Sequence, residues 1–318
     1  MYRSLLLTAA LLGLASPAHA TNARMTALSN NAGFIDDTDI FLYPSTLSDL
    51  PARATLNYDA GAFDGGFTLD DGRALWFQRH DPTGAETGFR ALYGKASGST
   101  GYLLRASQDA GTLTLGGAWS NGPGRGTPKN LAVDGDLRII GNLTSDMDFG
   151  LNAAVTSRTL EQRRMTLWSA GIDIDTAAEL AQISGAYTLG PRFSVDDARL
   201  ALQVGPAANI TVDTGGSADT IVNIVVPYAN FAGEYRLREW FKLRGSVTSA
   251  WVGDTDTGDI ANNMTWGNAV GGALGVGFSH NNAQFDMSVN PAWALGGPYL
   301  LSGAAAPMFG VLSARVDL

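Results

Sequence analysis

The chain lacks cysteine, has few histidines and carries few charges, and each shortage removes a class of protein. With no cysteine in 318 residues, the fold is stabilised without disulfides. After residue 20 only His80 and His280 remain as histidines, and no G-x-S-x-G motif surrounds a serine. A hydrolase centred on His80 would need such partners, so we expect no enzyme activity and no cofactor.

Long apolar runs are also missing, apart from one short run at the N-terminus. Arg3, the apolar stretch Leu5–Leu14 and the small residues Ala18-His19-Ala20 have the order of a secretory signal peptide, which we place at residues 1–20. No later segment approaches the roughly 18 apolar residues of a transmembrane helix. The mature chain is therefore predicted to leave the cytoplasm without a helical anchor.

The composition of the mature chain is acidic and rich in glycine. Removing Arg3 leaves 20 basic against 30 acidic residues, a charge of −10, which argues against nucleic acid as a partner. Glycine makes up 39 of 318 residues, well above the usual ~7%. Glycine-rich strands that carry aromatic residues are typical of a curved, closed sheet.

An alternation of apolar and polar residues is the strongest pattern that is present. Phe231, Tyr235 and Leu237 alternate with charged or small residues, and Phe241 and Leu243 continue the pattern after a break. This period of two predicts β-strands with one apolar and one polar face. Sixteen segments qualify as strands: 53–59, 65–70, 73–80, 87–96, 101–108, 111–120, 131–143, 147–157, 164–173, 179–189, 197–205, 221–238, 241–251, 266–279, 282–291 and 309–318.

These observations predict an all-β fold, an antiparallel up-and-down transmembrane β-barrel of residues 53–318. Short turns near Ser145 and Glu239 would share the periplasmic rim, yet five connections separate them. Either one of the segments between 157 and 220 is not a transmembrane strand or one of these turns faces outward, so we expect about 14 strands within a range of 12 to 16. A soluble exported β-protein also shows alternation and is the alternative fold. The last strand, 310–318, resembles the C-terminal strand that bacterial outer-membrane proteins present to their assembly machinery.

Two hairpins are short enough for their register to be predicted. At Glu239, pairing Leu237 with Phe241 and Tyr235 with Leu243 places Glu234 opposite Arg244, a favourable charge pair. At His280, a two-residue loop would pair Phe278 with Ala283 and Val276 with Phe285.

The polar face of the predicted strands supplies the candidate site. Charges inside a channel set a field that selects solutes, whereas paired charges merely fill the lumen. The lumen-lining candidates are Arg53, Asn57, Asp136, Arg138, Glu234, Arg236, Lys242, Arg244, Gln284, Asp286 and Asn290. A weaker candidate for a calcium site is the loop of Asp254, Asp256 and Asp259, although it does not fit the EF-hand pattern and is more readily a solvated loop.

The segment of residues 21–52 does not alternate, and it is expected to lie in the periplasm or to plug the lumen. Its Ala27-Leu28, Gly33, Asp36-Asp37, Asp39 and Pro44 resemble the opening of FadL-like outer-membrane barrels. That resemblance implies a fourteen-stranded barrel plugged by its N-terminal segment, and a hydrophobic substrate.

The function predicted from the sequence is that of a passive channel or facilitator for a small or hydrophobic solute in the outer membrane of a Gram-negative bacterium. Its other expected partners are outer-membrane lipid and lipopolysaccharide. A structural or secretion-accessory barrel is the alternative, and it would have an occluded lumen filled with mutually paired charges.

Overall fold

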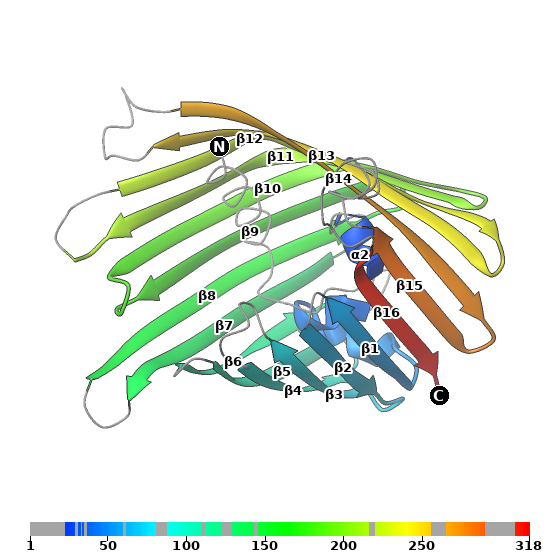
Figure 1. Ribbon diagram of the computed structural model, residues 1–318, viewed down its shortest axis with the longest axis horizontal. Helices are drawn as coiled ribbons and strands as arrows, with labels where there is room; N and C mark the ends of the chain where they lie inside the picture. The colour runs from blue at the N-terminus through cyan, green and yellow to red at the C-terminus, as the bar shows by residue number, and fades with distance from the viewer. Residues whose placement is uncertain are drawn as a thin grey trace, which may run out of the picture.

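The computed structural model describes residues 23–28, 31–32, 34, 37–59, 62–80, 88–109, 112–122, 129–142, 146–215, 220–255, 265–289 and 309–318. These residues form one short α-helix, two 3₁₀ helices and sixteen strands (Figure 1). The predicted signal peptide of residues 1–20 lies outside the described residues. Within the described part, no helix is long and apolar enough to cross a membrane.

The strands follow one another along the chain without an intervening helix. They are β1 (Arg53–Asp59), β2 (Ala62–Thr68), β3 (Arg73–His80), β4 (Gly88–Ser97), β5 (Thr100–Asp109), β6 (Thr112–Asn121), β7 (Lys129–Asn142), β8 (Asp146–Leu160), β9 (Arg164–Asp175), β10 (Leu180–Val195), β11 (Ala198–Asp213), β12 (Thr220–Arg238), β13 (Phe241–Thr255), β14 (Thr265–His280), β15 (Ala283–Val289) and β16 (Phe309–Asp317). Each of the sixteen predicted segments corresponds to one of them.

The sheet is a closed antiparallel barrel in which every strand pairs with its neighbours in the sequence, and β1 pairs with β16. Closure runs from Arg53 opposite Asp317 to Asp59 opposite Val311. A closed sheet leaves no unpaired edge, which a strand in hydrocarbon requires. The prediction of an all-β up-and-down barrel is confirmed, at the upper end of the expected strand number.

The strand number also resolves the conflict over the two short turns. The segment 143–145 joins β7 to β8, and Glu239-Trp240 joins β12 to β13. Five connections separate the two in an up-and-down barrel, so they lie at opposite rims. The expectation that short turns occur at one rim only is therefore wrong. We call the rim where β1 begins and β16 ends the terminal rim, and the other the distal rim.

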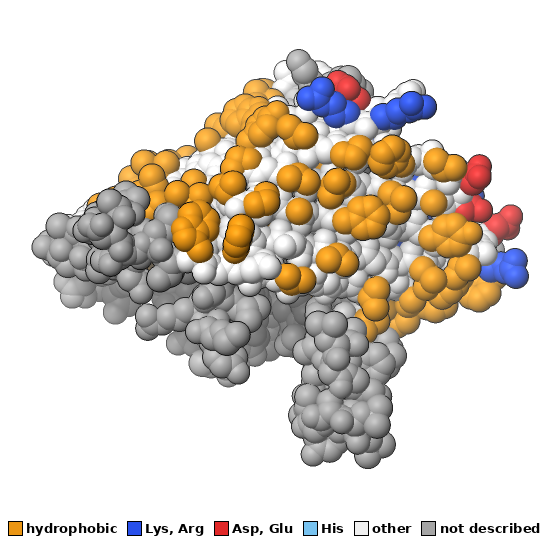
Figure 2. All heavy atoms as spheres, turned by 90° about the horizontal axis from the view of Figure 1, so that it is seen from above, with side chains coloured by type: hydrophobic (Ala, Val, Ile, Leu, Met, Phe, Trp, Pro, Cys, Tyr) orange, Lys and Arg blue, Asp and Glu red, His pale blue; other side chains and the backbone are white. Residues whose placement is uncertain are grey.

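The outer wall of the barrel is apolar. Side chains that alternate along each strand point outward and stay exposed, for example Leu56 and Leu104, which are 54% and 58% exposed. Hydrophobic side chains cover much of the wall in Figure 2, and the charged side chains visible there gather near its edges. An outward apolar band with a polar interior is the pattern of a transmembrane barrel.

Aromatic residues gather on the outer wall near the terminal rim. The rings of Trp240 and Phe241 lie 5.6 Å apart, those of Phe241 and Phe278 lie 5.2 Å apart, and Trp240 is 55% exposed. Tyrosine and tryptophan favour the boundary between hydrocarbon and water. Trp119, near the end of β6 at the same rim, is also exposed, and Tyr58 is exposed near the end of β1 at the distal rim.

The two predicted hairpins differ in outcome. Glu234 pairs with Arg244 and Tyr235 with Leu243, as expected, but a register shift after Arg236 leaves Arg238 opposite Phe241, so the pairing predicted for Leu237 is wrong.

At the second hairpin the predicted register is wrong by two residues. His280 pairs with Ala283, and Phe278 pairs with Phe285. The loop is Asn281-Asn282, and Asn281 has a φ of 52°. Asparagine tolerates this left-handed conformation, which a two-residue hairpin loop requires. The turn therefore begins one residue later than the histidine suggested.

Candidate functional site: the barrel lumen and its N-terminal plug

The described residues between Ala23 and Leu50 lie inside the ring of strands, and we call them the plug. They include α2 (Ala23–Ala27) and the 3₁₀ helices η1 (Asp37–Phe41) and η2 (Pro44–Asp49). η2 contacts β3 to β6, whereas α2 contacts β13 to β16 on another part of the wall. Figure 1 shows α2 within the barrel, beside β15 and β16. The plug thus spans the lumen between two walls.

Apolar packing holds the part of the plug formed by η1 and η2. Phe41 meets the inward Trp76 edge to face, with ring centroids 5.4 Å apart, and Leu47 is fully buried. These side chains form one buried cluster with Leu92 and Leu103 of β4 and β5. Burying such side chains contributes roughly 1.5–3 kcal/mol each, so this end of the plug is a packed core rather than a loose loop.

The barrel wall has glycine where the plug comes closest to it. A Cβ atom placed on Gly101 of β5 would lie 2.4 Å from the carbonyl carbon of Pro44, and one on Gly94 of β4 would lie 2.7 Å from Leu47. Next to them, the Ser45 backbone N–H donates to Ser120 Oγ at 2.8 Å. Only a wall without side chains at these two positions admits η2 at this distance.

A second set of contacts holds the part of the plug formed by α2 and the residues after it. Met25, Leu28 and Phe34 pack against the inward alanines of β11 and β12. The Ala23 backbone N–H donates to Ser313 Oγ at 2.8 Å, and Asn31 Nδ2 donates to the carbonyl of Asn230 at 3.0 Å. These hydrogen bonds link the plug to β16 and β12.

One arginine of the wall binds the plug, and we call the contacts of Arg158 with Asp39 and Tyr43 the Arg158 latch. Arg158 of β8 donates two hydrogen bonds to the carboxylate of Asp39, at 2.8 and 3.0 Å. Its guanidinium carbon also lies 4.5 Å from the centroid of the Tyr43 ring. A bidentate pair combined with a cation–π contact is specific in both charge and geometry.

Tyr43 completes the latch as a neutral phenol. Its side chain is almost fully buried, and its hydroxyl has no hydrogen-bond partner within the described part of the chain. Burial raises the pKa of the Tyr43 phenol well above its ordinary value of 10.0, against the opposing effect of the Arg158 charge. The plug therefore keeps Tyr43 uncharged.

The plug contacts cluster in the half of the lumen next to the terminal rim. Gly101 lies at the start of β5, Ser120 at the end of β6 and Arg158 near the end of β8, and all three positions belong to that half. None of the hydrogen bonds described above ties the plug to the last residues of a strand at the distal rim. The described plug contacts thus lie in the terminal half of the lumen and near its middle, where Ala23 and Asn31 reach β16 and β12.

Three groups of paired charges lie on the inner wall. In the first, Arg105 of β5 bridges two carboxylates of β7, donating to Asp134 at 2.8 Å and to Asp136 at 2.8 Å. Both Arg105 and Asp134 are buried. Each ion is thus satisfied by its neighbours, as buried charges require.

The second group surrounds Arg244, whose side chain has no exposed surface. It donates to Glu234 at 2.7 Å and to Asp286 at 2.6 Å. Gln284 donates to Asp286 at 2.6 Å and accepts from Arg315 at 2.5 Å. The cluster lies over Gly277 of β14, where a Cβ atom would approach Asp286 to 2.5 Å.

The third group lies closer to the distal rim. Arg138 of β7 pairs with Asp173 and lies 3.7 Å from Asp175, both on β9. Elsewhere on the wall, Asn57 donates to Asp64 at 2.6 Å, and Arg53 lies 3.3 Å from Asp317 at the closing seam. Many of the lumen-lining candidates are thus brought into pairs across neighbouring strands.

The remaining predicted site residues lie elsewhere. Arg236 is exposed at the terminal rim and pairs with Asp197 at 2.7 Å, while Lys242 is half-buried on β13. Asn290, Asp256 and Asp259 lie outside the described residues, and Asp254 lies in β13. In the described part of the chain, no group of three or more His, Cys, Asp or Glu side chains is placed to hold a metal ion.

Sequence reasoning missed Arg105, Asp134 and Arg158. Arg105 interrupts the apolar residues of the segment 101–108, and Arg158 follows the same parity as Asn152 and Thr156. A charged residue at an inward position in mid-strand is the signal that could have found them. Their partners lie 29 to 119 residues away in the sequence, so no local sequence pattern predicts these pairs.

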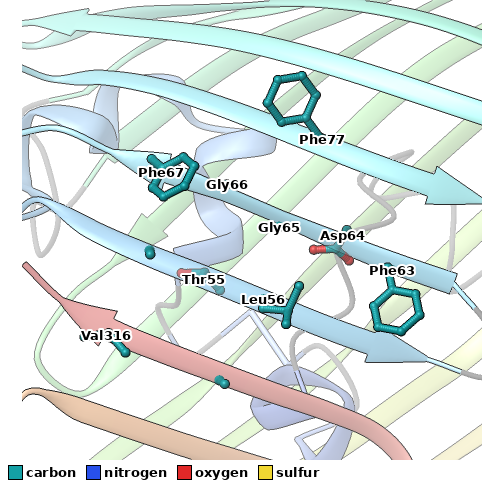
Figure 3. Close-up of a pocket in the computed structure, with 11 residues that line it drawn as sticks. Thr55, Leu56, Phe63, Asp64, Gly65, Gly66, Phe67, Phe77 and Val316 are labelled. Carbon is teal, nitrogen blue, oxygen red and sulfur yellow. The ribbon is translucent and has the colours of Figure 1, made fainter.

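A groove of about 530 Å³ runs along the outer wall over β16, β1, β2 and β3. Its lining is formed by Phe63, Phe67 and Phe77 around the small residues Ala54 and Gly65. Figure 3 shows the three phenylalanines on adjacent strands beside Leu56 and Val316. The groove belongs to the apolar outer face and is separate from the lumen.

Comparison with known proteins shows the fold alone. No protein-family model matches the chain, and no curated protein matches it in sequence. Among solved structures, it is similar to a bacterial polysaccharide outer membrane secretin, with a TM-score of 0.51 and 10% sequence identity over 84% of this chain and 97% of that chain. The comparisons thus support an outer-membrane type of barrel in general and not the FadL-like group, whose resemblance implied fourteen strands. The chain therefore has the fold of an outer-membrane β-barrel.

Proposed function

We propose that the protein is a channel of the bacterial outer membrane for a hydrophilic solute, held closed by its N-terminal plug. The observation that carries this proposal is the combination of an apolar outer wall, a polar inner wall and a plug bound to the inner wall. Barrels of sixteen strands are wide enough to leave an aqueous passage. The described plug contacts lie in the half of the passage next to the terminal rim and near its middle.

We assign the terminal rim to the periplasm. Bacterial barrels have short turns in the periplasm and longer loops outside, and the longest connections of this barrel lie at the distal rim. In this orientation the plug closes the periplasmic half. The long segments 256–264 and 290–308 join strands at the distal rim, which faces the exterior.

A secretion-related role is the second candidate, favoured by the likeness of this fold to a polysaccharide outer membrane secretin over 84% of the chain. A purely structural barrel also has paired lumenal charges, as seen around Arg105 and Arg244. The plug distinguishes a channel from a purely structural barrel, because a plug that can be displaced serves a channel and has no use in a structural barrel.

The test is the conductance of the purified, refolded protein in planar bilayers. Arg158→Ala removes both hydrogen bonds that Arg158 donates to the largely buried Asp39, and breaking such a pair costs about 3–5 kcal/mol. We therefore expect at least a tenfold rise in open-channel probability. Asp39→Asn weakens the same latch from the plug side without changing the barrel wall, and is expected to raise the open probability as well.

The matched control is Arg163→Ala, which removes an exposed arginine in the turn between β8 and β9. It is expected to conduct like the unmodified protein. Deleting residues 21–50 should give the largest conductance of the series. If the deletion variant folds but conducts no ions, the result would contradict the channel proposal and favour a structural barrel.

A further inference from the structure

A band of uncharged polar side chains crosses three neighbouring strands on the inner wall near the distal rim. It consists of Gln182 and Ser184 of β10, Asn209 and Thr211 of β11, and Asn223 of β12, and we call it the amide strip. Gln182 pairs with Thr211, Ser184 with Asn209, and Asn209 with Asn223. The five side chains therefore form one continuous patch, with strands about 4.8 Å apart.

The plug does not use this patch. On the same strands the plug contacts Gln203 and Asn230, which lie several residues closer to the terminal rim. Gln182 donates to Thr211 at 3.4 Å, a long hydrogen bond. Among the described residues, no hydrogen bond joins the plug to the strip.

Two members of the strip have an unmet hydrogen-bond acceptor. Asn209 and Asn223 are 8% and 4% exposed, and the side-chain amide oxygen of each has no hydrogen-bond partner among the residues that the structure describes. A buried polar group without a partner costs about 1–3 kcal/mol. Rotation of either amide toward the lumen would present its oxygen to the hydroxyl group of a ligand.

An apolar surface adjoins the strip toward the terminal rim. Val225, Ala250 and Val252 form a buried cluster on β12 and β13, with Ala207 and Tyr228 packed against it. The Tyr228 hydroxyl accepts from Asn230 at 3.1 Å. Amides and hydroxyls next to an aromatic ring and an apolar face match a sugar, which carries hydroxyl groups at its rim and C–H groups on its faces.

The charges around the strip favour a neutral ligand over an anionic one. Asp173, which pairs with Gln182 across β9 and β10, is held by Arg138. Asp175, Glu179 and Asp213 lie at the strand ends and turn beside the strip at the distal rim. Carboxylates there repel an acidic polymer, and the neighbouring arginine is already paired.

We infer that the amide strip is a binding site for a neutral oligosaccharide or polysaccharide. This inference names the solute class of the proposed channel and rests on that function for its biological meaning. Binding itself does not depend on conduction, so the two can fail separately.

The experiment is isothermal titration of the full-length refolded protein in an amine-oxide detergent, which avoids sugar-headed detergents that would compete. The probes are the neutral hexasaccharides maltohexaose and cellohexaose, and the acidic hexamer of galacturonic acid. We expect at least one neutral hexamer to bind at least tenfold more tightly than the acidic one. The double variant Asn209→Leu with Asn223→Leu should weaken that binding tenfold or more.

The matched control is Asn130→Leu, which removes a buried inward asparagine of β7 whose amide oxygen also lacks a partner. Thr211→Val is the milder second variant if the double variant does not refold, and it should weaken binding severalfold. Equal affinity in the strip variants, tighter binding of the acidic hexamer, or no binding of either neutral hexamer at millimolar concentration would overturn the inference. A chain that binds but never conducts would overturn only the channel.

Discussion

At the scale of single residues, the closed state of the proposed channel depends on how Arg158 and Tyr43 pack together in a buried space. Arg158 donates two hydrogen bonds to Asp39 and lies over the Tyr43 ring, so its charge is compensated twice. The Tyr43 hydroxyl and the Arg158 Nε atom, in contrast, have no hydrogen-bond partner among the described residues. The latch thus combines a strong ionic contact with two buried polar atoms that oppose closure.

Tyr43→Phe is therefore expected to tighten the plug. The variant keeps the ring under Arg158 and removes a buried hydroxyl that costs about 1–3 kcal/mol when unpaired. Open probability in planar bilayers should be severalfold lower than in the unmodified protein, which is best measured in the Asp39→Asn background where openings are frequent. A higher open probability would show that the hydroxyl helps closure.

Tyr43 is also expected to make the stability of the closed plug depend on pH in the alkaline range. Burial raises the pKa of Tyr43 in the closed state, whereas a released plug exposes a phenol with its ordinary pKa. The contribution of neutral Tyr43 to closure is complete below about pH 10 and is lost as the pH rises above that value. Conductance should rise above about pH 10 in the unmodified protein, and this rise should be smaller in Tyr43→Phe.

Part of the site could be predicted from the sequence at this scale, and part could not. Glu234 opposite Arg244 followed from a short hairpin, because a tight turn fixes the register of the strands it joins. The latch did not follow, since Asp39 and Arg158 are 119 residues apart and only barrel closure brings them together. The unmet oxygens of Asn209 and Asn223 likewise depend on the folded wall.

At the scale of structural elements, the fit between η2 and the wall depends on glycines of β4 and β5. The missing side chain at Gly101 leaves room for the backbone of Pro44 and Ser45. Sequence patterns predicted each strand, because alternation is local, but gave no reason to relate a glycine of β5 to a proline of the N-terminal segment. The role of a glycine on the inner wall can be recognised only when the segment that packs against it is known.

Gly101→Val is accordingly expected to displace η2 while leaving β5 intact. A Cβ atom at this position would lie 2.4 Å from three backbone atoms of the plug, which cannot rotate away. Open probability should rise at least tenfold, and the plug should become sensitive to protease. The control Gly267→Val adds a side chain that meets nothing within 4 Å, and an equal effect in both variants would contradict the steric explanation.

At the scale of the whole molecule, the outer wall decides between a membrane barrel and a soluble exported one. The sequence predicted the alternation that creates this wall, and the closed sheet explains why so many large apolar side chains remain exposed. In water such a surface would be an aggregation hazard. In a bilayer, lipid tails solvate the same apolar outer wall.

Substituting arginine into this wall tests that distinction. Leu104 lies midway along β5 and is 58% exposed, whereas Val195 ends β10 at the terminal rim and is 64% exposed. In a bilayer, Leu104→Arg should lower the free energy of unfolding by about 2–4 kcal/mol and Val195→Arg by about 0–1 kcal/mol. Urea titration in lipid vesicles measures both, and equal tolerance of the two would favour a soluble protein.

The plug is joined to β1 through Pro51 and Ala52 alone, and the carbonyl of Ala52 accepts a hydrogen bond from Leu318 at 2.9 Å. A displaced plug therefore remains tethered at the mouth it has left, where short tethers give effective concentrations in the millimolar range. Reclosure is then a first-order step whose rate is independent of protein abundance. In the proposed channel each barrel would reset itself, so the mean duration of an opening would be the reciprocal of that first-order reclosure rate.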